Sequence, residues 1–316
     1  MTQTFVLVNP ASANGKTRRQ WPSLALALRS QLGAFEVGFT EYSGHGTVLI
    51  REAIHRGVRH VVSVGGDGTH NEVVNGFFEG ERCLADDLCL SLVPAGTGGD
   101  LRRTLGLPTD PHAAILAVGR NRRRVDLGRM SYLNHDGEVA LAHFINIASF
   151  GAAGLVDRIV NRSSKVLGGR LSFMLGAVRG TMQYRNQAMQ VILNPEMPDE
   201  IRLRGRMFNG VIANARFFGG GMKVAPDALM DDGLFDVITM GELSTLDVVR
   251  GMPSLYAGTH VDRAKIQTFR ASVIRAEPTQ GEEILIDLDG EQPGRLPATF
   301  SVLPKMIEVS HGDSIP

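Results

Sequence analysis

The sequence predicts two domains, an N-terminal α/β domain with a doubly wound parallel sheet and a C-terminal domain rich in antiparallel β-structure. Three observations support this prediction. The chain has 316 residues, which is enough for about two domains of ~150 residues each. Up to about residue 125, short β-forming runs alternate with segments of helical spacing. Beyond that point short β-like runs dominate, so we expect domains at 1–127 and 128–304, with the tail 305–316 as a candidate addition to the first.

In the first domain, each expected strand is followed by an expected helix. Apolar, β-rich runs indicate strands at residues 4–10, 35–41, 60–66 and 88–96. Helical spacing indicates helices at residues 18–32, 47–57, 70–78 and 110–120. Such an alternation is typical of parallel βαβ units, which bind ligands outside the carboxyl ends of their strands. The loops after the strands are therefore the first place to look for a site.

The second domain is expected to be mainly β-structure. Short β-like runs occur at residues 142–151, 188–194, 204–215, 234–241, 271–277, 282–291 and 298–309. Only residues 156–183 and 244–256 have helical spacing in this half. Runs of this length and spacing favour antiparallel sheets.

The bulk composition excludes several classes of protein. Formal net charge is zero, so no global field attracts nucleic acid, and we expect no nucleic-acid partner. Cys83 and Cys89 form neither a disulfide framework nor a convincing metal motif. The start of the chain is unlike a signal peptide, and no apolar run approaches the ~20 residues of a membrane span. These features predict a cytoplasmic protein and leave peripheral membrane contact open.

Two loops after strands have the composition of phosphate-binding turns. The stretch NPASANGKT, residues 9–17, offers backbone N–H groups and a lysine, although it lacks the Walker A spacing and an ordinary turn is the alternative. The stretch GGDGTHNE, residues 65–72, has three glycines that let the backbone approach a ligand closely. Asp67 is out of place beside an anion unless a cation such as Mg²⁺ lies between them. A helix cap is the alternative role for Asp67.

Three further clusters carry hydrogen-bonding groups or carboxylates. In PAGTGGD, residues 94–100, Thr97 suits a phosphate and Asp100 suits either a metal ion or a helix cap. In the loop 227–236, four aspartates and the loop carbonyls are hard oxygen ligands of the kind that Mg²⁺ or Ca²⁺ prefers. In ILIDLDGEQ, the carboxylates at 287, 289 and 291 are expected to share one strand face until Gly290 breaks the run, with a solvated acidic edge as the alternative.

Together these motifs resemble the diacylglycerol kinase catalytic domain, whose superfamily includes bacterial soluble lipid kinases, sphingosine kinases and ceramide kinases. The resemblance follows family order and covers nearly the whole chain: NPASANGK, GGDGTHNE, PAGTGGD, APDALMDDGLFDV and DGE. It implies a phosphofructokinase- and NAD kinase-like α/β domain and a β-sandwich domain, with the active site in the cleft between them. It also implies transfer of the γ-phosphoryl group of ATP to the hydroxyl of diacylglycerol or a related lipid, in phospholipid metabolism.

The resemblance also implies roles for particular residues. The ATP contacts carried over by position are Asn9, Thr40, Gly66, Asp67, Gly68, Thr69, His70, Asn71, Glu72 and Thr97. In the turn after Thr40, His45 replaces the acid usual in the family. A structural Mg²⁺, or alternatively Ca²⁺, is expected at the Asp232 carboxylate and the carbonyls of Leu229 and Leu234. A catalytic Mg²⁺ is expected at Asp67 and Asp100, and the proton acceptor is expected to be Glu291 or Asp289.

A protein that phosphorylates a lipid has to reach it. From Arg158 to Arg185 there are six basic residues and no acidic one, with apolar residues between them, which suits an anionic bilayer surface. A core helix with a solvated basic face is the alternative. An NAD kinase-like enzyme and a catalytically idle lipid- or nucleotide-binding regulator are the competing functions. The physiological lipid and the oligomeric state, a homodimer included, stay open.

Overall fold

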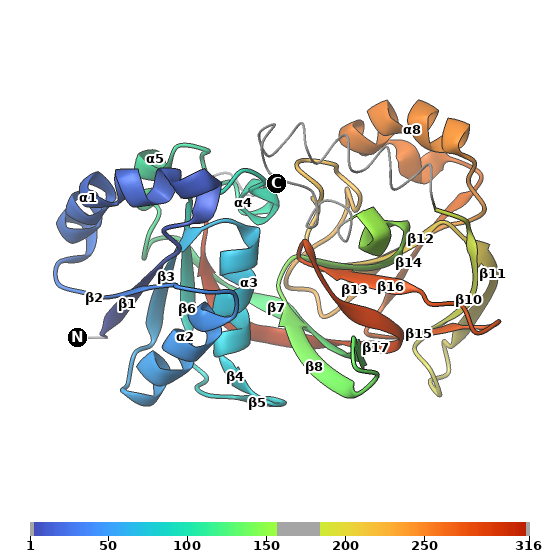
Figure 1. Ribbon diagram of the computed structural model, residues 1–316, viewed down its shortest axis with the longest axis horizontal. Coiled ribbons are helices and arrows are strands. Elements are labelled where there is room, and N and C mark those ends of the chain that lie inside the picture. The colour runs from blue at the N-terminus through green and yellow to red at the C-terminus, as the bar shows by residue number, and fades with distance from the viewer. Residues whose placement is uncertain (1–2, 157–183, 314–316) are drawn as a thin grey trace. The chain divides into compact units, whose positions relative to one another are not determined.

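The computed structural model describes residues 3–156 and 184–313. The chain divides into two units, the first made of residues 1–126 and 304–316 and the second of residues 127–303. Figure 1 labels the helices and strands. The N-terminal α/β and C-terminal β-sandwich classes predicted from the sequence are confirmed.

A five-stranded parallel sheet forms the centre of the first unit. Its strands are β1 (Thr4–Val8), β2 (Glu36–Phe39), β3 (His60–Gly65), β6 (Cys89–Pro94) and the last residues of β17 (Glu291–Ser310). Their order is β17-β6-β3-β1-β2, and every pair is parallel. The carboxyl ends of β1, β3 and β6 consequently lie side by side, as the βαβ alternation predicts.

Helices cover both faces of this sheet (Figure 1). On one face α1 (Ser12–Leu32) packs beside α5 (Pro111–Ile115), and on the other α2 (His45–His55) packs beside α3 (Asp67–Gly76). The core under α1 and α5 consists of aliphatic side chains from the helices and from the sheet, among them Val6, Leu24, Leu28, Val62 and Val93. The short helix α4 (Asp100–Thr104) follows β6, and β4 (Phe78–Glu79) pairs with β5 (Arg82–Cys83).

The second unit is built from antiparallel strands. One sheet has the order β14 (Ile266–Ala271), β13 (Phe235–Met240), β12 (Asn209–Ala213), β9 (Ile147–Gly151), β16 (Leu285–Leu288) and the start of β17. Further strands are β7 (Arg122–Asn134), β8 (Val139–Phe144), β10 (Gln187–Leu193), β11 (Ile201–Met207) and β15 (Val273–Pro278). Its described residues also include helix α8 (Thr245–Ala257) and a 3₁₀ turn (His260–Asp262).

Strand β17 connects two sets of strands in the second unit. It pairs with β16 near Arg295 and with β15 near Phe300. The core of this unit contains aromatic and aliphatic side chains from both sets of strands, including Phe144, Phe150 and Phe300, all with no exposed surface. Apolar faces from two sheets that bury each other are the defining feature of a β-sandwich.

Several local expectations differ from the structure. Residues 204–215 form two strands, because the backbone N–H of Phe208 turns away to the carbonyls of Met240 and Gly241. Strand β7 was not expected, because its run of charged residues at 122–124 does not show the usual alternation. The helix expected at 110–120 ends at Ile115 and continues as tight turns. The helix expected at 156–183 lies, beyond Val156, outside the described residues.

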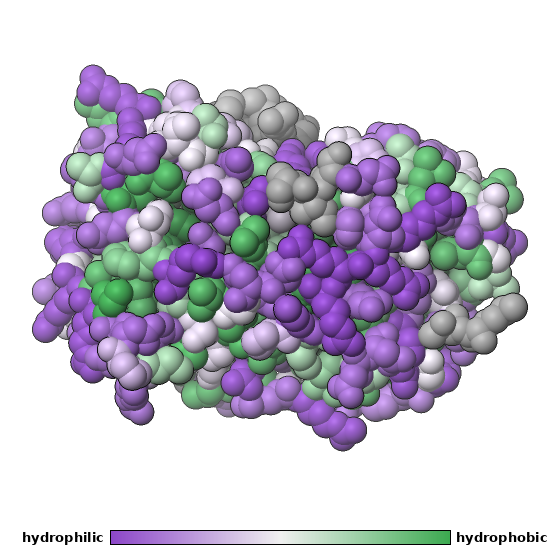
Figure 2. All heavy atoms as spheres, turned by 180° about the vertical axis from the view of Figure 1, so that it is seen from behind, coloured by the Kyte–Doolittle hydropathy of each residue, from purple (hydrophilic) through white to green (hydrophobic). Residues whose placement is uncertain are grey.

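From the side shown in Figure 2, hydrophobic residues lie in small groups among hydrophilic ones. Among residues 3–156 and 184–313, no helix has both the length and the apolar character that crossing a bilayer requires.

A buried histidine links three strands of the parallel sheet. His60 on β3 contacts the hydroxyl of Thr4 on β1 at 3.3 Å and that of Ser91 on β6 at 2.8 Å. Ser91 in turn contacts Ser310 at the end of β17 at 2.8 Å. Burial, with a smaller effect from the positive charge of Arg122, lowers the pKa of His60 to about 4, so the ring is neutral at pH 7. A neutral ring is required here because the hydroxyl groups cannot stabilise a buried charge.

We expect the protein to lose stability as the pH falls from 6.5 to 5. Burial is the largest cause that lowers the pKa of His60, His70 and His143 to about 4 in the folded state. The unfolded chain binds protons below about pH 6.5 and the folded chain does not, so the free energy of unfolding falls as pH falls through this window. Each histidine contributes up to about 2 kcal/mol by pH 5. Urea denaturation at pH 7 and pH 5 measures the loss.

Two variants sharpen this experiment. His60→Gln removes one of the buried rings whose pKa is lowered, and it should make the stability less dependent on pH. His112→Gln changes an exposed position and should leave the pH dependence unchanged. Equal unfolding free energies for the wild type at pH 7 and pH 5 would show that the buried rings do not act this way.

Candidate active site

Three loops at the carboxyl ends of β1, β3 and β6 are bound to one another. Asn9, directly after β1, donates from its side-chain amide to the hydroxyl of Thr69 at 3.0 Å. The hydroxyl of Thr17 donates to the carbonyl of Ala95 at 3.0 Å. The backbone N–H of Ala95 donates to the carbonyl of Gly65 at 2.7 Å. The structure therefore brings together three of the five clusters that the sequence singled out.

The glycines of these loops allow this close approach. A Cβ on Gly96 would lie 2.4 Å from the Cα of Gly66, closer than real contacts permit. A Cβ on Gly65 would lie 2.4 Å from the hydroxyl oxygen of Thr69. Glycine is thus required at both positions by neighbouring protein atoms, before any ligand is considered.

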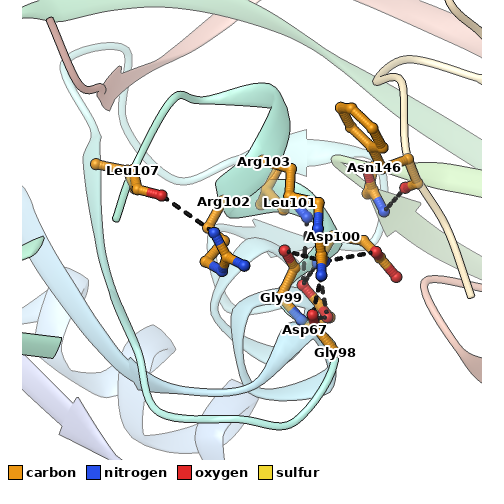
Figure 3. A network of polar contacts seen from close by, with 10 residues as sticks. Asp67, Gly98, Gly99, Asp100, Leu101, Arg102, Arg103, Leu107 and Asn146 are labelled. Atoms are coloured by element: carbon orange, nitrogen blue, oxygen red, sulfur yellow. Dashed lines mark hydrogen bonds and ion pairs between the residues drawn. The ribbon is translucent and has the colours of Figure 1, made fainter. Parts of the chain in front are cut away.

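The carboxylate of Asp67 binds the start of helix α4 (Figure 3). It accepts hydrogen bonds from the backbone N–H groups of Gly99 at 2.8 Å, Asp100 at 3.1 Å and Leu101 at 3.4 Å. A negative charge at a helix N-terminus is stabilised by these amides and by the helix dipole. Asp67 is therefore a helix cap, but for α4 and not for its own helix α3. These three amides are engaged by protein atoms.

Asp67 and Asp100 each have a carboxylate oxygen close to Gly98, a position without a side chain. A Cβ built on Gly98 would be 2.8 Å from Oδ2 of Asp67 and 4.0 Å from Oδ2 of Asp100. Only glycine leaves this space open next to the Asp67 carboxylate. The two carboxylates near this position are hard oxygen ligands of the kind that Mg²⁺ prefers. The residues present therefore fit the metal role expected for this pair.

Four other residues expected to contact ATP have different environments. Glu72 accepts hydrogen bonds from the backbone N–H groups of Gly44 and Gly46, each at 2.8 Å, and so caps helix α2. The His70 ring is buried, contacts the Ser63 hydroxyl at 2.8 Å and has a pKa lowered to about 4, mainly by burial. These two side chains are thus engaged by the protein, while Thr97 is exposed. Thr40 is buried, and its backbone N–H donates to the carbonyl of Val8.

The C-terminal carboxylates lie around a hairpin turn of the second unit. Strand β16 ends at Leu288, Asp289 and Gly290 have φ values of 50° and 90°, and Leu288 pairs with Glu291 across the turn. Two residues with positive φ form a tight hairpin turn. The expectation that the three carboxylates share one face of a single strand is therefore wrong, because the chain reverses between them.

Each of these carboxylates has its own environment. The Asp289 side chain is buried and accepts hydrogen bonds from the backbone N–H groups of Ile145 at 3.3 Å and Ile147 at 2.9 Å. Asp287 is also buried; it accepts from the Ser149 hydroxyl and the Gly290 N–H, each at 2.9 Å. Glu291 is exposed on the far side of the turn. Accessibility to an incoming hydroxyl group therefore favours Glu291 over Asp289 as the candidate proton acceptor.

The aspartate-rich loop 227–236 is held by an arginine. Asp232 forms an ion pair with Arg270, and its Oδ1 accepts from the N–H of Leu234 at 3.1 Å. Burial and the negative charge of Asp227 raise the pKa of Asp236 to about 6. Within the described parts of the chain, no three side chains of His, Cys, Asp or Glu form a metal-binding group. A cation bound by Asp232 and loop carbonyls would share that carboxylate with Arg270.

Two family models together match most of the chain. Residues 3–130 match the diacylglycerol kinase catalytic domain, and residues 146–311 match the YegS C-terminal NAD kinase beta sandwich-like domain. The chain belongs to the diacylglycerol kinase family. This membership makes the protein a lipid kinase by class and confirms the resemblance seen in its motifs.

Individual relatives of this lipid kinase cover almost its entire length. It is 28% identical over 323 residues to the diacylglycerol kinase of Bacillus subtilis, and the aligned region covers 98% of this chain and 96% of the relative. The crystal structure of a proposed diacylglycerol kinase from Bacillus anthracis matches its fold with a TM-score of 0.79 at 20% identity, covering 99% and 96% of the two chains. Yeast NADH kinase in complex with NADH matches with a TM-score of 0.53 at 10% identity, over 98% and 84%.

Sequence reasoning missed the residues of this lipid kinase that hold its loops in place. Thr17 and Arg103 contact the loop after β6, at Ala95 and at Gly98 and Gly99. The partner of Thr17 is 78 residues away, so no local pattern reveals it. Arg103 lies only five residues after Gly98, and an arginine one turn into a helix that starts at a glycine loop is a signal that was available.

Proposed function

We propose that the protein transfers the γ-phosphoryl group of ATP to a lipid hydroxyl with the help of Mg²⁺, and that diacylglycerol is the acceptor to test first. The relatives that cover the chain end to end are named diacylglycerol kinases. The observation that carries the proposal is the meeting of the β1, β3 and β6 loops with two carboxylates beside Gly98. Phosphoryl transfer needs this kind of positioning and charge neutralisation more than covalent chemistry.

On the ATP side, the loops would supply donors and carboxylates. Bound Mg²⁺ would neutralise charge on the phosphate oxygens, and Asp67 and Asp100 are the side chains that would hold it. Asn9 and Thr69 are already oriented toward each other by their hydrogen bond, so that their side chains can contact ATP with little loss of freedom on binding. Thr97, exposed in the loop after β6, would add a hydroxyl donor for a phosphate oxygen.

On the acceptor side, the hairpin turn would supply the proton acceptor. Glu291 is the candidate base for the lipid hydroxyl because it is exposed, and Asp289 is the residue that shapes the turn by binding two backbone amides. A structural Mg²⁺ or Ca²⁺ at Asp232, Leu229 and Leu234 remains part of the proposal, and a thermal shift on adding either cation would support it.

We expect Glu291→Gln to lower kcat roughly 100-fold and to leave the thermal unfolding midpoint nearly unchanged, because the exposed side chain adds little to packing. Asp289→Asn should lower the midpoint, because one buried amide loses its charged acceptor at a cost of about 1–3 kcal/mol. Steady-state kinetics with calorimetry separates the two roles. A fully active Glu291→Gln together with an inactive but stable Asp289→Asn would reverse the assignment.

Radiolabelled ATP and Mg²⁺ with mixed vesicles of diacylglycerol and phospholipid test the function directly, with a total lipid extract as the second arm. A labelled lipid product supports the proposal and identifies the acceptor. NAD⁺ and NADH are included as acceptors because the fold also matches yeast NADH kinase. Labelled nicotinamide dinucleotide without labelled lipid would favour that alternative. Failure to label any acceptor would favour an idle binding protein.

Contact with an anionic membrane also belongs to the proposal. The basic stretch from Arg158 to Arg185 that motivates it lies, except for its last two residues, outside the described part of the chain. Co-sedimentation with neutral and with anionic vesicles tests it, and equal binding to both would remove the electrostatic explanation.

A further inference from the structure

The loop that leads into α4 is held from two sides (Figure 3). On one side Asp67 accepts hydrogen bonds from its backbone N–H groups. On the other side Nη1 of Arg103 lies 2.7 Å from the carbonyl oxygen of Gly98 and 2.8 Å from that of Gly99. The same nitrogen lies 3.0 Å from Oδ1 of Asp100. Arg103 thus contacts the carbonyls of the loop whose amides Asp67 contacts.

The chemistry of arginine suits this place. The Arg103 side chain is only 24% exposed, and it lies three residues after Asp100, which puts both on one side of the first turn of α4. A guanidinium keeps its charge at every working pH and presents donors in a fixed plane, so it can bind several oxygens without rearranging. Gly99, at the start of α4, has φ 66° and ψ 47°, which is the left-handed conformation.

We propose that Arg103 is a positioning residue for phosphoryl transfer. It orients the carboxylate of Asp100 and fixes the turn at Gly98 and Gly99, so that the carboxylates of Asp67 and Asp100 keep their positions beside Gly98. Arg103 acts through Asp100 and the loop backbone, and it needs no contact of its own with substrate. The inference rests on the proposed function, because it assigns Asp100 to the same site.

The preceding residue provides a matched control. Arg102 lies in the same helix and packs beside Gly99, where a Cβ would be 2.7 Å from its Nε. Its Nη1 donates to the carbonyl of Leu107 at 3.3 Å, and burial lowers its pKa. Arg102→Ala therefore removes an equally basic, half-buried side chain that has no hydrogen bond to residues 98–100 among the described contacts.

The experiment compares the wild type with Arg103→Ala, Arg103→Lys and Arg102→Ala. Arg103→Ala should lower kcat roughly 10- to 100-fold and raise the Mg²⁺ concentration needed for half-maximal activity, with the KM for lipid unchanged, because a misplaced catalytic loop loses rate without losing substrate affinity. Arg103→Lys keeps the positive charge but loses the planar set of donors, so its kcat and its Mg²⁺ requirement should lie between those of the wild type and Arg103→Ala. Arg102→Ala should stay close to wild type in each measurement.

Amide hydrogen exchange gives a readout without turnover. The amides of Gly99, Asp100 and Leu101, which Asp67 binds, should exchange about tenfold faster in Arg103→Ala and at wild-type rates in Arg102→Ala. The positioning role would be overturned if Arg103→Ala and Arg102→Ala lost equal amounts of activity and of amide protection. It would also be overturned if Arg103→Ala changed neither the amide exchange nor the Mg²⁺ dependence. If the wild type phosphorylates no lipid, the proposed function fails. In that case the role of Arg103 is still tested without turnover. Amide exchange in this loop and binding of Mg·ATP are then compared between the wild type and Arg103→Ala.

Discussion

Replacing Asp67 by alanine is expected to abolish lipid phosphorylation, with kcat reduced at least roughly 100-fold at saturating Mg²⁺. Two consequences combine in this variant. The opening beside Gly98 loses one of its two carboxylates, and the amides of Gly99, Asp100 and Leu101 lose their acceptor. Loss of a helix cap costs about 1 kcal/mol, so the fold should survive. Radiolabelled-ATP transfer and thermal unfolding of the purified variant measure both effects.

Two further substitutions separate the charge of Asp67 from its capping role. Asp67→Asn keeps an acceptor oxygen for the helix but removes the negative charge, and it should be nearly as inactive as Asp67→Ala if the charge holds a cation. Asp110→Ala is the matched control, because Asp110 caps α5 by accepting from the N–H of Ala113 at 2.9 Å and has no proposed part in the site. It should lose a similar amount of stability and keep its activity. An active Asp67→Asn would assign Asp67 to capping alone.

Replacing Val309 by aspartate is expected to have the largest effect on stability. Val309 has no exposed surface and pairs with Leu90 of β6 in the parallel sheet of the first unit. A carboxylate at this position would have no partner, and burying a polar group without one costs several kcal/mol, so we expect a loss of about 4–5 kcal/mol. That loss is a large part of the net stability of a typical protein.

The single tryptophan makes this prediction easy to measure. Trp21 is the only tryptophan of the chain, and it packs edge-to-face on Phe39 of β2 at 5.7 Å between ring centroids. Its fluorescence during urea denaturation therefore reports on the first unit. The control is Val139→Asp, in which the same change is made at a valine that is 76% exposed on β8. Similar urea midpoints for the two variants would show that the end of β17 contributes little to the sheet.

The sequence predicts the elements around the site well, because their signals are local. A strand that ends in Gly65-Gly66 and a helix that follows can be inferred from neighbouring residues alone, and the structure has β3 and α3 there. The same holds for the loop after β6, where glycine and proline mark the turn. At Asp289-Gly290 the Asp-Gly pair indicates a hairpin turn while the alternation of carboxylates indicates a strand, and the structure has the turn.

The partners of the site carboxylates could not be predicted in the same way. Asp67 binds amides 32 to 34 residues farther along the chain, and Asp289 binds amides more than 140 residues away. Such partners depend on which strands lie side by side, and no periodicity in the sequence encodes that. The sequence therefore allows a helix cap as the role of Asp67, but only the structure identifies α4 as the helix that it caps.

The sequence by itself determined the composition of the site: glycine loops after parallel strands, with Asp67 among them, and a distant Asp-Gly-Glu turn. These features follow from local backbone preferences and from the residue types that phosphoryl transfer needs. Only the tertiary structure decided that Asp67 and Glu72 cap helices elsewhere in the unit, that Asp289 is buried against backbone amides, and that the end of β17 completes the parallel sheet. The physical reason is that buried carboxylates and open strand edges must find hydrogen-bond partners, and folding brings those partners from distant parts of the chain.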